Sequence, residues 1–134
     1  AGLRVRLDLE KMTGAVQNIW TYAGMGIGDG IISLLEPEKI DGVVIEALGA
    51  GNLPPLAARE ITSLMDKGVP VVLVSRCFNG IAEPVYAYEG GGVKLQEAGV
   101  MFVKELNAPK ARLKLLIALS AGLEGQELKD YIEG

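Results

Sequence analysis

Polar and glycine-rich segments follow the apolar runs of this sequence, and they hold the residues that could do chemistry. Ser75 and Arg76 end the apolar run 69–74, Asn52 closes the segment 49–52, and glycines alternate with other residues in 23–30. A serine can act as a nucleophile, and an arginine can bind a carboxylate through two parallel hydrogen bonds. An asparagine amide both donates and accepts, and a glycine-rich turn can hold phosphate on its backbone N–H groups.

Each of these side chains also has a simpler structural interpretation. The chain contains no histidine, so Ser75 lacks the base that usually activates such a nucleophile. Arg76 can equally form an ion pair with Glu46 or Glu83 that only stabilises the fold. Asn52 can act as the N-cap of the helix that follows it. The residue types alone therefore favour structural roles and leave the chemical ones open.

Three further features have two interpretations in the same way. The glycines of 23–30 depart from the GxGxxG spacing of a dinucleotide site, which favours a tight turn. Cys77, the single cysteine, could be a reactive thiol, but such residues are more often small buried hydrophobes. Lys110, Arg112 and Lys114 lie near the start of a predicted helix, where cations oppose the dipole, and a solvated face is the simplest interpretation.

The elements that position these residues alternate between strands and helices. The apolar and β-branched composition of 69–74 is typical of a strand buried on both faces of a parallel sheet. The same patterns predict strands at 16–22, 43–47, 69–74 and 100–103, and helices at 31–35, 56–67, 93–98, 109–122 and 127–132. We therefore expect an α/β fold: a three-layer α/β/α domain, Rossmann-like or flavodoxin-like, with a parallel sheet of about four strands. The polar segments then meet at the carboxyl edge of the sheet, where ligands bind in such folds.

Length, composition and charge restrict the class of protein. The chain has 134 residues, of which 49% are hydrophobic, enough for one domain with one core. It has no apolar run that could span a bilayer and no signal-peptide pattern, so we expect a soluble cytoplasmic protein with no membrane partner. The net charge of −4 and the lack of a basic stripe argue against nucleic acid. The absence of histidine removes the commonest metal ligand, and we expect neither a metal nor a cofactor.

Four segments, taken in order, resemble the C-terminal domain of the bacterial-type L-asparaginases: residues 41–55, 67–80, 85–100 and 107–120. The resemblance implies that 15–134 form this domain and that 1–14 are an interdomain linker or arm. In that family a larger N-terminal domain carries two catalytic threonines, in TGGT-like and HGTDT-like motifs. Neither motif occurs in this chain. The resemblance therefore implies a chain without catalytic residues that is inactive by itself.

The resemblance also assigns binding roles to particular residues. Asn52 matches the asparagine that this domain contributes to the substrate site of a neighbouring subunit. Glu89 matches the carboxylate expected to hold the α-amino group of the substrate, with Glu83 as the alternative. Tyr88, Ser75 and Arg76 complete the implied substrate-binding set. The implied substrate pair is L-asparagine and L-aspartate, and the implied assembly is a homo-oligomer, either a dimer or a tetramer.

Two other functions stay open at this point. The C-terminal domain of a related tRNA-dependent amidotransferase would have the same fold, and a glutaminase would share it too. The chain could also be a free-standing module that binds a ligand or partner without catalysis, for example through the apolar helix 113–119.

Overall fold

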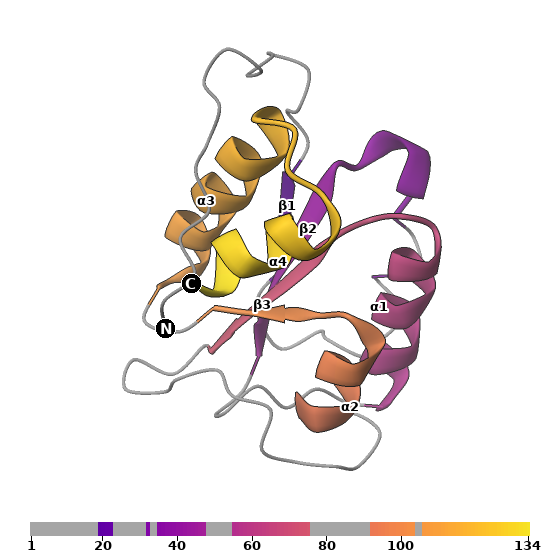
Figure 1. Cartoon of the computed structure of the whole chain (residues 1–134). Coiled ribbons are helices and arrows are strands. Elements are labelled where there is room, and N and C mark those ends of the chain that lie inside the picture. The colour runs from indigo at the N-terminus through magenta and orange to yellow at the C-terminus, as the bar shows by residue number, and fades with distance from the viewer. Residues whose placement is uncertain (1–18, 23–31, 33–34, 48–54, 76–91, 104–105) are drawn as a thin grey trace.

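The computed structural model of the chain describes residues 19–22, 32, 35–47, 55–75, 92–103 and 106–134 (Figure 1). These residues form one sheet with helices on both faces. The predicted α/β fold with a parallel, doubly covered sheet is confirmed.

All strands of the described sheet run in the same direction. Their order in space is their order in sequence, β1-β2-β3-β4. The bounds are Ile19–Tyr22 for β1, Gly42–Ala47 for β2, Val71–Ser75 for β3 and Met101–Phe102 for β4. Because right-handed crossovers between successive parallel strands all pass over the same face, this order predicts one face covered by the connections and the other by later helices.

The helices divide between the faces as that rule requires. The connections contain the 3-10 helix η3 (Pro37–Lys39) and the α-helices α1 (Pro55–Asp66) and α2 (Gly92–Ala98). The helices that follow β4 are α3 (Ala108–Ser120) and α4 (Gly125–Glu133). Figure 1 shows α1 and α2 on one side of the sheet and α3 with α4 on the other.

Successive side chains along each strand point to opposite faces of the sheet, so the core has two separate halves. Ile45 and Leu73 pack with α1 and α2, whereas Val44, Val72 and Val74 pack with α3 and α4. All five side chains are fully buried. The central strands β2 and β3 are therefore apolar on both faces, as the composition of 69–74 predicted.

The structure adds an element at Pro37 to the prediction. We expected a helix over 31–35 to stop near this proline; Ile32 is in a 3-10 helical conformation, Leu35 and Glu36 are outside a helix, and Pro37 begins the separate 3-10 helix η3. The fixed φ of proline suits the first turn of a helix, where its missing N–H would have no partner. Of the predicted helix, Ile32 and Leu35 are described, and the N–H of Leu35 donates to the carbonyl of Ile32 at 3.1 Å.

The structure also corrects the interpretation of the basic residues of α3 as a solvated face. The Nε of Arg112 donates to the backbone carbonyl of Ile19 at 2.9 Å. The Nζ of Lys114 donates to the carbonyls of Ile132 and Gly134 at 3.0 and 3.3 Å and lies 5.4 Å from the ring centroid of Tyr131. Arg112 therefore links α3 to β1 through a hydrogen bond, and Lys114 links α3 to the end of α4 in the same way.

Replacing Lys114 with methionine is expected to lower the free energy of unfolding by about 1 kcal/mol, because the carbonyls at the end of α4 lose a charged donor. Urea denaturation measures the change. Lys110→Met is the control, since Lys110 is exposed on the same helix. Equal losses in both variants would contradict a specific role for Lys114.

Burial lowers the pKa of the Lys114 ammonium below its ordinary value. The unfolded chain therefore holds this proton more tightly than the folded chain. Between the folded pKa and the ordinary lysine value of about 10.4, the contribution of Lys114 to stability rises with pH. Lys114→Met should remove this rise from the pH dependence of unfolding, which the same denaturation measurement detects.

Candidate functional site

The carboxyl ends of the strands bring three chain segments to one edge of the sheet. β2 ends at Ala47 and β3 at Ser75, and these two residues are register partners. β1 ends at Tyr22, which pairs with Ile45 of β2. The segments that begin at residues 23, 48 and 76 therefore leave the sheet from neighbouring positions, as the sequence predicted.

Rigid packing supports this edge. Ile45, Leu73 and Val74, which lie close before the strand ends, have no solvent exposure. Glu46 is half-buried one residue before the end of β2 and pairs in register with Val74, so it brings a carboxylate to the edge. A fixed strand end is a suitable base for binding residues, because it limits the positions available to the loop that follows.

Of the predicted site residues, only the backbone of Ser75 lies in the described part of the structure. The backbone of Ser75 is the last of β3, and its side chain lies outside the described part of the structure. Asn52, Arg76, Tyr88 and Glu89 lie outside the described residues, as do Glu83 and Cys77. Their roles stay predictions.

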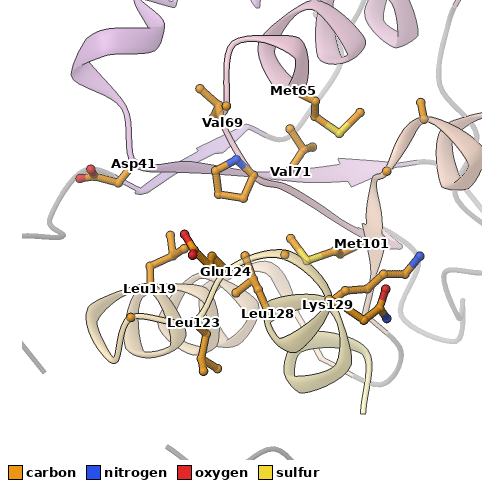
Figure 2. A pocket seen from close by; sticks show the side chains of 17 residues that line it. Asp41, Met65, Val69, Val71, Met101, Leu119, Leu123, Glu124, Leu128 and Lys129 are labelled. Carbon is orange, nitrogen blue, oxygen red and sulfur yellow. The ribbon is translucent and has the colours of Figure 1, made fainter. Parts of the chain in front are cut away.

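A pocket of about 640 Å³ lies at the opposite, amino edge of the sheet (Figure 2). Its lining joins the residues that precede β2, β3 and β4 to the α3–α4 connection. Figure 2 shows Met65, Val69 and Val71 on one side and Leu123 and Leu128 on the other. These five lining residues are apolar, while carboxylates and an ammonium also lie among the lining side chains: Asp41, Glu124 and Lys129. This pocket contains none of the predicted site residues.

The C-terminal ends of three helices contribute to the lining of this pocket. The sequence predicts these helix ends but not the pocket. Gly68, Gly99 and Gly122 follow the C-terminal ends of α1, α2 and α3, have positive φ, and all line the pocket. A glycine in this conformation commonly terminates a helix. Each of these glycines could be predicted from the sequence as a helix end, but the sheet topology decides that all three lie around one pocket.

Neither a metal site nor a membrane span is found in the described part of the chain. No group of three or more acidic, cysteine or histidine side chains there could hold a metal ion. None of the described helices combines the length and the apolar character needed to cross a bilayer.

Comparison with known families identifies the fold. Residues 16–132 match the family model described as the glutaminase/asparaginase C-terminal domain. The chain belongs to this family. The match covers the described strands and helices, and it confirms the resemblance seen in the sequence.

Individual relatives place the domain within longer proteins. A protein described as a probable L-asparaginase, from Deinococcus radiodurans, is 44% identical over 114 residues, which are 85% of this chain and 34% of the relative. A glutamyl-tRNA(Gln) amidotransferase subunit from Pyrococcus furiosus is 31% identical over 121 residues, 90% of this chain and 26% of the relative. This C-terminal domain therefore spans about a third or less of these curated relatives.

A solved structure supports the fold of the domain independently. The structure described as a probable cytoplasmic L-asparaginase from Campylobacter jejuni superimposes with a TM-score of 0.72 at 24% identity, covering 94% of this chain and 37% of that one. The matched part of that structure thus has the same fold as this chain.

Proposed function

We propose that this domain supplies substrate-binding residues to an amidohydrolase that converts L-asparagine to L-aspartate and ammonia. The nucleophile would lie on a part of the enzyme outside this chain. The main support is the family match over 16–132, together with three chain segments that begin at neighbouring strand ends. The 134-residue chain alone is expected to be inactive.

In this proposal the side chains beyond the strand ends bind the substrate. The carboxylate of Glu89 would accept hydrogen bonds from the substrate α-ammonium group, a charge-assisted interaction that is stronger than a neutral one. The amide of Asn52 would donate and accept at the same site. Tyr88, Ser75 and Arg76 would shape the loop around them.

We further propose that the enzyme is a homo-oligomer, a dimer or tetramer, in which this domain contributes to a neighbouring subunit's site. A domain that binds substrate but holds no nucleophile needs a second domain beside it, from its own chain or another. We also propose a cytoplasmic location, since the Campylobacter jejuni relative is described as a probable cytoplasmic enzyme.

A fusion tests the substrate. In this fused protein, the chain replaces the matching 34% of the Deinococcus radiodurans relative, and the rest of that relative is kept. We expect it to release ammonia from asparagine at a higher kcat/KM than from glutamine. A preference for glutamine would contradict the proposed substrate.

The tRNA-dependent amidotransferase is a second candidate, supported by the Pyrococcus furiosus relative that matches 90% of this chain. In such an enzyme, the released ammonia is transferred to the amino acid carried by a charged tRNA. This candidate predicts low ammonia release until the remaining amidotransferase components and charged tRNA are added. The fused protein should show no such dependence if it is an asparaginase.

A further inference from the structure

The pocket at the amino edge of the sheet has the size and the lining of a small-molecule site. Its volume of about 640 Å³ lies within the range of about 300–1,000 Å³ that is usual for such sites. The apolar part of its lining includes five buried side chains: Val69, Val71, Met101, Leu123 and Leu128. The packing of the core therefore holds this part of the lining in place before any ligand binds.

Three helices end at this pocket, and their ends give it a negative electrostatic potential. Gly68, Gly99 and Gly122 follow the C-terminal ends of α1, α2 and α3 and line the pocket. The last carbonyl groups of a helix carry a partial negative charge, which favours a cation nearby. Among the described helices, α4 alone begins at this pocket and brings the opposite partial charge.

The charged side chains of the lining add to the negative potential. Asp41 and Glu124 contribute carboxylates, and Lys129 contributes an ammonium group. The ammonium of Lys129 lies 4.0 Å from the carboxylate of Glu133, which is outside the pocket lining. Because this ion pair balances the charge of Lys129, the pocket keeps a net negative charge.

Glu124 is placed to bind a ligand in this pocket. It is the N-cap residue of α4, but its side chain makes no capping hydrogen bond. Figure 2 shows its carboxylate between the side of Val69 and the side of Leu123. Glu124 is exposed to solvent, so a ligand that enters the pocket can reach it. A carboxylate beside helix C-termini attracts a cation and repels an anion.

We propose that this pocket binds an organic cation, with its ammonium group at Glu124 and the helix C-termini and its apolar part against the buried side chains. The strand β3 separates the pocket from the opposite edge of the sheet. From Val71 to Ser75 the strand makes four steps of about 3.3 Å, or about 13 Å in total. The pocket is thus a second site on the domain, and the proposal does not depend on the proposed enzymatic function.

Titration of the 134-residue chain with hexylammonium, followed by amide NMR, tests the proposal. Hexanol and hexanoate are matched probes, because they carry the same carbon chain with a neutral or a negative head group. Hexylammonium should shift the resonances of Gly68, Gly99 and Gly122, while Gly134, outside the lining, is the reference. Its Kd should be about tenfold lower than that of hexanol, because a hydrogen bond between charged groups is stronger than a neutral one. Hexanoate should bind most weakly.

A pair of variants tests the position of the ammonium group. Glu124→Gln should raise the Kd of hexylammonium by about fivefold and leave that of hexanol unchanged, because only the cation loses an opposite charge. Glu127→Gln is the control, since Glu127 is exposed on the same helix and lies outside the pocket lining.

Three results would each overturn the proposal: equal Kd values for hexylammonium and hexanol, equal effects of the two substitutions, or shifts confined to residues outside the pocket. Shifts of the same glycine resonances with protein concentration alone would make a second copy of the chain the occupant, and would overturn it too.

Discussion

Replacing Glu89 with glutamine in the fused protein is expected to lower kcat/KM for asparagine by about 100-fold, mainly through a higher KM. The substitution keeps the shape of the side chain and removes the charge that is proposed to bind the substrate ammonium. A hydrogen bond to a charged group contributes about 1.5–3 kcal/mol, and about 2.7 kcal/mol corresponds to 100-fold. Steady-state kinetics of ammonia release measure the effect.

Glu83 provides the matched control, because it lies in the same segment between β3 and α2. Glu83→Gln should change kcat/KM by less than about threefold, as expected for a carboxylate without a substrate contact. An unchanged KM in Glu89→Gln together with a large loss in Glu83→Gln would transfer the role to Glu83. Unchanged kinetics in both variants would contradict the assignment of this segment to the substrate site.

Replacing Leu115 with alanine is expected to lower the free energy of unfolding by about 3 kcal/mol, a large part of the total for a domain of this size. Leu115 is fully buried and joins α3 to β1 and β2. It packs directly on the backbone of Gly42: a Cβ at Gly42 would lie 2.9 Å from the Cδ2 of Leu115. Urea denaturation followed by circular dichroism gives the difference.

Leu56 of α1 is the control for this substitution, since it is 40% exposed. Leu56→Ala should change the free energy of unfolding by no more than about 0.5 kcal/mol. A loss below about 1 kcal/mol in Leu115→Ala would mean that the α3 face of the core packs less tightly than described.

The central strands could be predicted because their composition reflects burial on both faces. Val72 and Val74 belong to a β-branched run that pairs on each side with another strand, and no helical spacing competes with it. The helix over 56–67 was predicted from its prolines and Gly68, and α1 agrees within a residue at each end. Local sequence patterns are sufficient to predict an element whose conformation depends mainly on its own residues.

Contacts between distant elements could not be predicted in this way. Arg112 donates to Ile19, which is 93 positions earlier in the chain, and the backbone N–H of Phe102 donates to the carboxylate of Glu133 at 2.8 Å. Spacing along the sequence does not show which backbone groups the fold leaves unpaired. The basic residues of α3 therefore resembled a solvated face, although two of them bind backbone carbonyls.

The candidate site depends even more on information outside local patterns. The sheet edge followed from strand order, but side chains such as Asn52 and Glu89 gained a chemical role only through the family resemblance. Composition favoured a helix cap for Asn52, because an asparagine before a helix usually has that role. In the proposed function the substrate site also includes residues outside this chain, so the sequence of this domain alone cannot show the whole site.

Ammonia release from asparagine is the measurement that tests the proposed function most directly. The 134-residue chain alone should release none above the uncatalysed rate, and the fused protein should hydrolyse asparagine with kinetics that depend on Glu89 and Asn52. Hydrolysis by the isolated chain would contradict the claim that the nucleophile lies elsewhere. Full activity of a fused protein carrying both Asn52→Ala and Glu89→Gln would contradict the claim that this domain binds the substrate.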